Sequence, residues 1–305
     1  MKRILVVGCG DVAQRAIPWL VRRFRVFALV RRPEAADVLR RLGAVPLMAD
    51  LDDRRSLARL AGIADAVLHF APPPAQGRTD TRTRHLIAAL ASRPSLPQHL
   101  IYISTTGVYG DCGGAIVDET RPCRPLTPRA ARRVDAEHQL REFGRRRGVA
   151  VCILRAPGIY AADRLPLARI RRGDPVLSAA DDVHTNHIHA DDLARLAVLA
   201  LTRGRGGRAY NAVDDTTLRM GDYFDAVADA FGLTRPPRMS RTEIAQVLPA
   251  MTLSFMSESR RMDNRRISRE LRVRLRYPTV GAGLLAAQGA HTLDQTHLTD
   301  APESS

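Results

Sequence analysis

The feature that most constrains this chain is a glycine turn directly after its first apolar segment. Residues 4–7 are aliphatic and mostly β-branched, Gly8 and Gly10 follow, and an amphipathic stretch begins at Asp11. This order predicts a strand, a tight turn and a helix. With Ala13, the turn reads G-x-G-x-x-A: the first glycine permits the turn, the second lets backbone approach a pyrophosphate, and the small third residue lets helix pack on strand. We interpret it as a dinucleotide site, with a glycine turn that binds nothing as the alternative.

Strand and helix patterns alternate through the first half of the chain. Further strands are predicted at residues 25–30, 44–48, 65–70, 99–104 and 149–154, and helices at 33–43, 53–61, 80–92 and 128–147. Such alternation predicts an α/β fold with a doubly wound parallel sheet and helices on both faces. Ligands of these sheets bind beyond the carboxyl ends of the strands. Five of those ends are Gly8, Arg31, Asp50, Ala71 and Thr105.

The end of the second strand bears on the choice of cofactor. NAD sites place Asp or Glu there, about 20 residues past the glycine turn, to bind the ribose 2′-hydroxyl. This chain has Arg31 and Arg32 instead. A guanidinium pairs bidentately with the 2′-phosphate of NADP. The sequence therefore favours NADP over NAD, with two solvated surface arginines as the alternative.

Composition limits the classes of protein and partner. The 305 residues suffice for one large α/β domain or two lobes, and no apolar run reaches the ~18 residues of a membrane span. The net charge is +15, but Lys2 is the only lysine among 47 basic residues. That skew indicates a genomic codon bias, so we expect no nucleic-acid partner, and the missing apolar span predicts no membrane partner. Four scattered cysteines and no signal peptide favour the reducing cytoplasm.

Several motifs in order resemble the extended short-chain dehydrogenase/reductase superfamily, also called the NAD-dependent epimerase/dehydratase family, and its atypical members in particular. The resemblance covers the chain to about residue 285. Besides the glycine turn and Asp50, it rests on three later motifs. These are Ser-Thr-Thr-Gly-Val-Tyr-Gly at 104–110, Arg-Ala-Pro-Gly-Ile-Tyr at 155–160 and Asn-His-Ile-His-Ala-Asp-Asp-Leu at 186–193.

The resemblance implies a Rossmann-type sheet joined to a smaller, mostly helical C-terminal substrate lobe. The NAD(P)-binding domain would be residues 1–155, completed by 186–213. The interleaved substrate-binding lobe would be residues 156–287. Residues 288–305 have little apolar content and are predicted to form a disordered tail.

The resemblance also assigns roles to single residues. Asp50 would contact the adenine, Ala71 would line the cofactor, and Thr105 would fill the catalytic Ser/Thr position. The predicted cofactor-binding residues are Gly8, Cys9, Gly10, Asp11, Val12, Ala13, Arg31, Arg32, Asp50, Leu51, Ala71, Pro72, Thr105 and Arg133.

The resemblance breaks at the chemistry. The family uses Tyr-x-x-x-Lys on the long helix, with the tyrosine as acid/base and the lysine lowering its pKa and holding the nicotinamide ribose. Alignment on Ala136 and Glu137 puts Arg129 at the tyrosine and Arg133 at the lysine. By this alignment, Arg133 would keep a cation beside the ribose. Arg129 cannot replace a phenol, because a guanidinium does not deprotonate at useful pH.

Other groups are weaker candidates. Tyr109 and Tyr160 are better explained as packing residues. His187 and His189 lie near two aspartates and could ligate a metal, but a strand-to-helix joint capped by Asp191 or Asp192 is the better interpretation, so no metal is expected.

An acid/base pair at Asp118 and Glu119, in a loop over the pocket, has a solvated loop as its alternative. Two functions therefore stay open. One is an NADP-dependent oxidoreductase or epimerase-like enzyme that uses Thr105 with a proton from substrate or solvent. The other is an NADP(H)-binding sensor without hydride chemistry. Neither the substrate nor the oligomeric state follows from these motifs.

Overall fold

A seven-stranded parallel sheet forms the centre of the computed structural model, which describes residues 2–299. The strand order is β12-β7-β5-β4-β1-β2-β3, so the chain reverses its direction of travel across the sheet between β1 and β4. This arrangement confirms the predicted doubly wound α/β sheet. The strands are β1 (Arg3–Val7), β2 (Arg25–Val30), β3 (Val45–Met48), β4 (Ala66–His69), β5 (His99–Thr105), β7 (Ala150–Ala156) and β12 (Ala209–Asn211).

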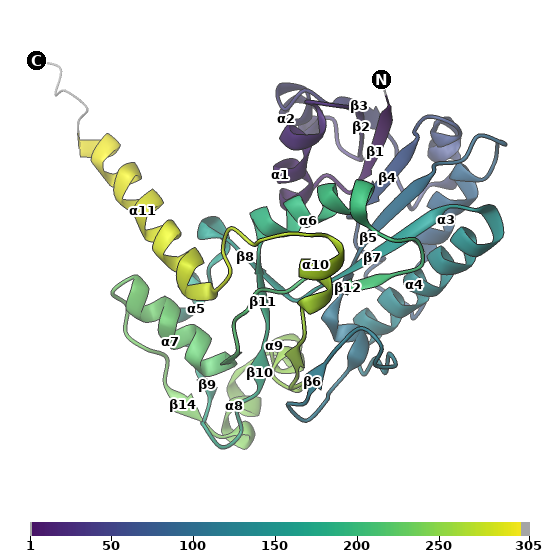
Figure 1. The fold of residues 1–305 in the computed structure, drawn as a ribbon. Helices are drawn as coiled ribbons and strands as arrows, with labels where there is room; N and C mark the ends of the chain where they lie inside the picture. Colours follow the sequence, from purple (N-terminus) through teal and green to yellow (C-terminus); the bar gives the residue numbers. More distant parts are fainter. Residues whose placement is uncertain (1, 300–305) are drawn as a thin grey trace, which may run out of the picture.

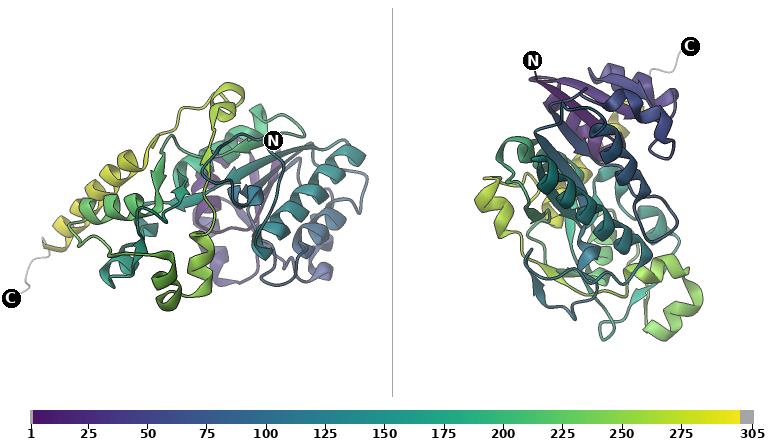
Figure 2. Two further views of the ribbon diagram at one scale, coloured as in Figure 1. Left: turned by 90° about the horizontal axis from the view of Figure 1, so that it is seen from below. Right: turned by 90° about the vertical axis from the view of Figure 1, so that its right-hand side faces the viewer.

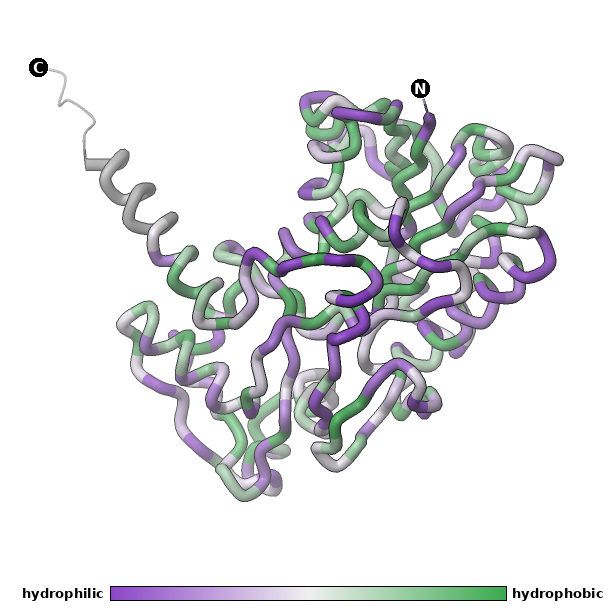
Figure 3. The backbone as a smooth tube through the Cα atoms, in the orientation of Figure 1, coloured by the Kyte–Doolittle hydropathy of each residue, from purple (hydrophilic) through white to green (hydrophobic). Residues whose placement is uncertain are grey.

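Helices cover both faces of this sheet (Figure 1). In β1, Val6 packs with the helices of one face and Leu5 with those of the other. Burial on both sides explains why the strand is continuously apolar, as Figure 3 shows for the tube that leads from the N-terminus. One face carries α1 (Asp11–Leu20), α2 (Glu34–Arg41) and α6 (Ala190–Arg203), and the other η1 (Arg54–Leu60), α3 (Thr81–Leu90) and α4 (Pro128–Arg147).

Local signals fix both ends of α4, the helix that carries Arg129 and Arg133. Thr127 is the N-cap, and its side chain accepts a hydrogen bond from the backbone N–H of Ala130. Pro128 occupies the first turn, where its missing N–H has no cost. Gly148 follows the last turn with a φ of +69°, a left-handed conformation that favours glycine.

The second lobe consists of short strand pairs and helices from the later part of the chain, below and to the left of the sheet in Figure 1. Its own core includes Tyr160, Tyr223 and Leu284. The helical elements are η3 (Ala162–Arg164), α5 (Leu167–Arg171), α7 (Met220–Ala230), α8 (Arg241–Val247), α9 (Ala250–Phe255) and α11 (Val280–Thr299). A further helix, α10 (Arg265–Glu270), packs against β12 at the edge of the central sheet. The strand pairs are β8 (Gly158–Tyr160) with β11 (His187–His189), β9 (Val176–Leu177) with β14 (Arg238–Met239), and β10 (His184–Thr185) with β13 (Leu218–Arg219). A further pair joins β6 (Ile116–Val117) to β15 (Arg261–Met262).

The tail prediction was wrong as far as Thr299. Residues 288–299 continue helix α11, which leads away from the sheet in Figure 1 and in the left view of Figure 2. The helix is anchored at its start, where Val280, Leu284 and Ala287 are buried at i, i+4 and i+7. Low apolar content argued against burial, but it does not prevent an anchored helix from continuing. Residues 300–305 of the predicted tail lie outside the described residues.

One smaller expectation also differs from the structure. The helix expected at residues 53–61 is the 3-10 helix η1. Residues 271–277 pair with no strand, but Leu271 and Val273 are buried. Over residues 2–299, every helix is too short or too polar to span a bilayer.

Candidate functional site

The turn between β1 and α1 has the backbone that a dinucleotide site needs. Gly8 has a φ of +87°, and a Cβ on it would lie 2.3 Å from the backbone nitrogen of Ala71. Gly10 is the N-cap of α1, and a Cβ there would meet no atom within 4 Å. Gly10 thus borders open space at a helix N-terminus, where a side chain would obstruct a pyrophosphate. Burial raises the pKa of the Cys9 thiol to about 12, so this cysteine is no nucleophile.

A cleft of about 1020 Å³ extends from this turn along the carboxyl ends of the strands. Every residue predicted from the sequence to bind the cofactor lines it. They are Gly8, Cys9, Gly10, Asp11, Val12, Ala13, Arg31, Arg32, Asp50, Leu51, Ala71, Pro72, Thr105 and Arg133.

The end of the cleft beyond β2 is basic. Arg31 and Arg32 are exposed there. The neighbouring carboxylate, Asp52, is held by Arg82 through two hydrogen bonds of 2.8 and 2.6 Å. Arg82 keeps the pKa of Asp52 below its usual value, so the carboxylate is ionised and its charge is already matched. The charge of Arg31 also lowers the pKa of Asp52, but within residues 2–299 neither exposed arginine forms an ion pair.

Thr105 ends β5 and faces the middle of the cleft. It is the N-cap of η2 (Thr106–Tyr109), and its Oγ1 accepts a hydrogen bond from the N–H of Gly107 at 3.2 Å. Because the oxygen acts as an acceptor in that contact, the hydroxyl hydrogen can be donated to a ligand. The geometry suits a group that donates a hydrogen bond to a substrate oxygen.

Arg129 and Arg133 both line the cleft, one helical turn apart on α4. Arg133 Nη1 donates to the hydroxyl of Tyr102 at 2.9 Å and to the carbonyl of Ile103 at 2.7 Å. These contacts fix the guanidinium against β5, so a cation stands at this point of the cleft. Burial lowers the pKa of Arg129, but the group remains a guanidinium and takes no proton-transfer role.

Sequence reasoning missed the part of the lining that the second lobe contributes. Its titratable side chains there are Arg164, His184, Glu258 and Arg260. Arg260 Nη1 donates to Glu258 Oε2 at 2.6 Å and to the carbonyl of Gly110 at 2.8 Å, which ties this lobe to the 104–110 motif. None of the four belongs to a recognisable motif, so only the tertiary structure brings them to the cleft.

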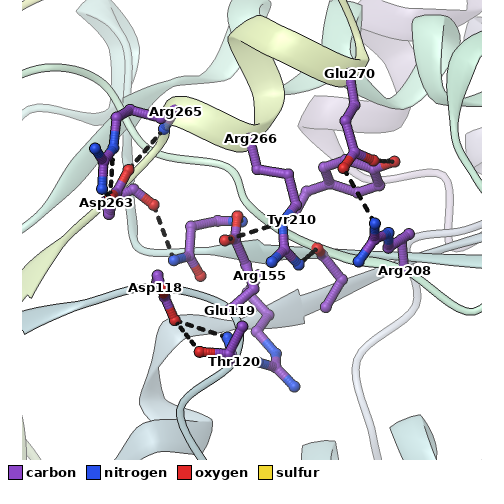
Figure 4. A network of polar contacts seen from close by, with 12 residues as sticks. Asp118, Glu119, Thr120, Arg155, Arg208, Tyr210, Asp263, Arg265, Arg266 and Glu270 are labelled. Carbon is purple, nitrogen blue, oxygen red and sulfur yellow. Dashed lines mark hydrogen bonds and ion pairs between the residues drawn. The ribbon is translucent and has the colours of Figure 1, made fainter.

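The prediction that Asp118 and Glu119 lie in a loop over the pocket was wrong. Neither lines the cleft, and Glu119 is held in an interior network (Figure 4). Its Oε1 accepts from the backbone N–H of Asn211 at 2.9 Å, and its Oε2 lies 3.3 Å from Arg266 Nε. Burial raises the pKa of Glu119, whereas Thr120 lowers the pKa of Asp118 by hydrogen bonding. Glu119 thus connects its loop to β12 and α10, Asp118 is exposed and accepts from Thr120, and neither serves the cleft.

The two tyrosines considered as replacements lie outside the cleft lining. The hydroxyl of Tyr109 accepts from Arg155 Nη1 at 2.7 Å and donates to Asn211 Oδ1 at 2.8 Å. Tyr160 is buried and donates to the carbonyl of Thr279 at 3.1 Å. Both side chains pack and hydrogen-bond within the protein.

The histidines at the strand-to-helix joint have structural partners. His189, not an aspartate, caps α6, because its Nδ1 accepts from the N–H of Asp191 at 3.2 Å. Asp192 instead accepts from the backbone N–H groups of Arg276 and Tyr277. Across the described part of the chain, no three His, Cys, Asp or Glu side chains are arranged to hold a metal ion.

Comparison with known proteins gives relatives along most of the chain. A Stigmatella aurantiaca protein, 4-hydroxy-2-methyl-3-oxo-4-farnesyl-3,4-dihydroquinoline-1-oxide ketoreductase, is 26% identical over 250 residues, covering 76% of this chain and 74% of its own. A conserved Silicibacter pomeroyi protein of unknown function superposes with a TM-score of 0.81 and 29% identity, covering 95% and 99% of the two chains. A Bacillus cereus UDP-glucuronic acid 4-epimerase, solved with UDP-glucuronic acid and NAD, shares the fold with a TM-score of 0.74 and 19% identity over 95% and 99%.

A family model provides the assignment. The model described as the NAD dependent epimerase/dehydratase family matches residues 18–212, which is well over half of the chain. The match begins after the glycine turn, so the turn geometry is independent support for it. Together with the sheet and the cleft, this confirms the resemblance read from the sequence motifs: the chain belongs to the NAD-dependent epimerase/dehydratase family, with an oxidoreductase fold of the short-chain dehydrogenase/reductase kind.

Proposed function

We propose that this protein is an NADP(H)-preferring oxidoreductase that acts on a small carbonyl compound or a nucleotide sugar. The observation that carries the proposal is the single cleft that joins the glycine turn, the exposed Arg31 and Arg32, and a second-lobe wall. A dinucleotide lying along the strand ends would leave the second-lobe part for a substrate. The ketoreductase relative supports reduction as the reaction type.

The chain's residues would divide the work along the cleft. The glycine turn would receive the pyrophosphate, Arg31 the 2′-phosphate, and Arg133 the nicotinamide ribose. The nicotinamide supplies or accepts the hydride. Thr105 would donate a hydrogen bond to the substrate oxygen and so stabilise the charge that develops there. The proton itself would come from solvent or substrate, because Arg129 cannot release one.

A non-catalytic NADP(H) sensor is the second candidate. The observation that favours it is the pair Arg129 and Arg133 in place of the family's tyrosine and lysine. A sensor would keep the cofactor half of the cleft and need no proton donor. Either function suits a reducing cytoplasm, since all four cysteines are free thiols.

The deciding experiment has two stages. Purified protein is titrated with NADPH and NADH while nicotinamide fluorescence and melting temperature are followed. We expect NADPH to bind more tightly, and absence of binding by either would refute both candidates. Aldehydes, ketones and nucleotide sugars are then screened for NADPH consumption. Turnover supports the oxidoreductase, and binding without turnover across the panel supports the sensor.

A further inference from the structure

A cluster of five charged side chains joins the two lobes beside the glycine turn. Asp11, in the first turn of α1, accepts from Arg15 Nε at 2.8 Å and from Arg164 Nη1 at 3.0 Å. Arg15 also donates through Nη1 to Asp191 at 2.8 Å and through Nη2 to Asp163 at 3.0 Å. The cluster therefore connects α1 with α6 and with η3 of the second lobe.

The two arginines differ in how many of their nitrogens are already engaged within the cluster. All three nitrogens of Arg15 are engaged, and Arg15 does not line the cleft. Arg164 contacts Asp11 through Nη1, lines the cleft, and has a side chain 37% exposed. A guanidinium carries five N–H donors in a planar fork, so one edge can hold a carboxylate while another meets a phosphate. Arg15 thus links α1 to α6 and η3, and Arg164 retains N–H groups that can bind a ligand in the cleft.

The position of Asp11 requires such a cation. Its carboxylate stands at the N-terminus of α1, where the glycine turn would receive a pyrophosphate, and an unpaired carboxylate would repel that anion. Asp163 and Asp191 add negative charge to the cluster, so Arg15 alone does not neutralise it. Arg164 is the cation that faces the cleft at this point.

We propose that Arg164 is a pyrophosphate-binding residue, contributed by the second lobe and held over the glycine turn by Asp11. The proposal rests on the proposed cofactor function and deepens it, because cofactor binding would then draw on both lobes. The family motifs in the first domain do not supply this contact, and η3 has no sequence signal for it. Arg164 would bind NADPH and NADH alike, since both carry the pyrophosphate.

The test compares Arg164→Gln, Arg164→Lys and Asp163→Asn in the full chain. Dissociation constants are measured for NADPH and NADH by fluorescence and for ADP-ribose by competition. We expect Arg164→Gln to weaken all three by about tenfold, the effect of losing one charge-assisted contact. Arg164→Lys, which keeps the charge, should recover part of the loss. Asp163→Asn removes the charge that pairs Arg15 with η3, at a residue that does not line the cleft, so its dissociation constants should stay within about twofold of wild type.

Two results would overturn the proposal. One is an Arg164→Gln variant that binds all three ligands as tightly as wild type. The other is an equal loss of affinity in Asp163→Asn, which would show that the contact between Arg15 and η3, not the guanidinium of Arg164, is responsible. Melting temperatures without ligand identify any variant that fails to fold, and Arg164→Lys then decides. Wild-type protein that binds neither dinucleotide would refute the proposed function as well, whereas binding without turnover would leave the Arg164 assignment standing.

Discussion

Glu137 and Arg155 form an ion pair in the interior, with 2.7 Å between Glu137 Oε2 and Arg155 Nη2. Their side chains are 1% and 4% exposed. Glu137 Oε1 also accepts from the hydroxyl of Ser104 at 2.6 Å. Burial alone would raise the pKa of Glu137, but the hydrogen bonds and charge of Arg155 outweigh it and the pKa lies below its usual value. The pair fixes α4, β5 and β7 to one another behind the cleft.

Replacing Glu137 with glutamine should therefore destabilise the fold. The substitution leaves the buried guanidinium of Arg155 without a countercharge, which costs about 3–5 kcal/mol in free energy of unfolding. Because the folded-state pKa of Glu137 is depressed, its contribution is present above the unfolded pKa and is lost as pH falls. Urea denaturation near pH 7 measures the change.

The matched control is Glu142→Gln on the same helix. Glu142 pairs with Arg145 and Arg146, but its side chain is 41% exposed and those pairs are screened by water. Its urea midpoint should match wild type. If the Glu137 variant were equally stable, the ion pair would not be what holds these elements together.

The fold could be predicted because its signals are local. The glycine turn, the apolar strands and the capped ends of α4 each depend on residues within about 20 positions of one another, so each could be predicted separately. The residue that caps the N-terminus of α6 was harder to predict. His189 and Asp191 are two residues apart, and choosing between them requires the side-chain geometry.

The second wall of the cleft could not be predicted. Arg164 reaches Asp11 from 153 positions along the chain, and Arg260 reaches Gly110 from 150. No spacing or composition rule links such residues, because their proximity comes from the packing of one lobe on another. Glu119 illustrates the reverse error, since a polar loop residue was expected in solvent and is buried against Arg266.

Asp214 should make stability depend on pH near neutrality. Its Oδ1 accepts from the N–H of Thr216 at 3.0 Å, and burial raises its pKa to about 7. The neighbouring His187, whose carbonyl accepts from the N–H of Asp214, has a pKa lowered by burial to about 4 and is neutral above that. Asp192 and Asp215 raise the pKa of Asp214 further by their charge.

The sign follows from the raised pKa. Between the unfolded value of 3.8 and about 7, the unfolded chain releases the Asp214 proton while the folded chain keeps it, so stability falls as pH rises. Asp214→Asn removes the titrating carboxyl, so the variant does not lose this stability as pH rises. Its melting temperature relative to wild type should therefore increase from pH 4.5 to pH 8. Asp37→Asn, at an exposed position on α2, should keep the wild-type dependence, and a constant difference for Asp214→Asn would contradict the expected titration.

Arg133 should matter for both dinucleotides equally. Arg133→Met removes the cation beside the predicted ribose position, so NADPH and NADH should both bind about tenfold more weakly. Arg133→Lys restores the family's own residue type and should recover most of the affinity. Arg145→Met, at an exposed position on the same helix, is the control.

The Arg133→Met variant also leaves the buried hydroxyl of Tyr102 without its donor, so its melting temperature must be measured beside the affinities. A folded Arg133→Met protein with wild-type affinity for both dinucleotides would show that the guanidinium serves only to brace β5.

Arg31 should discriminate between the two dinucleotides. Arg31→Glu replaces a donor to the 2′-phosphate by a carboxylate that repels the phosphate and accepts from the 2′-hydroxyl of NAD instead. We expect NADPH to bind at least about tenfold more weakly, and NADH to bind as well as before or better. Titrations give the ratio of the NADPH and NADH dissociation constants. Both are run at one ionic strength, because salt screens exposed charges.

Arg235→Glu, in the second lobe and paired there with Asp229, is the control, because it matches the change in net charge without touching the cleft. Equal losses for NADPH and NADH in the Arg31 variant would remove the 2′-phosphate role and with it the preference for NADP.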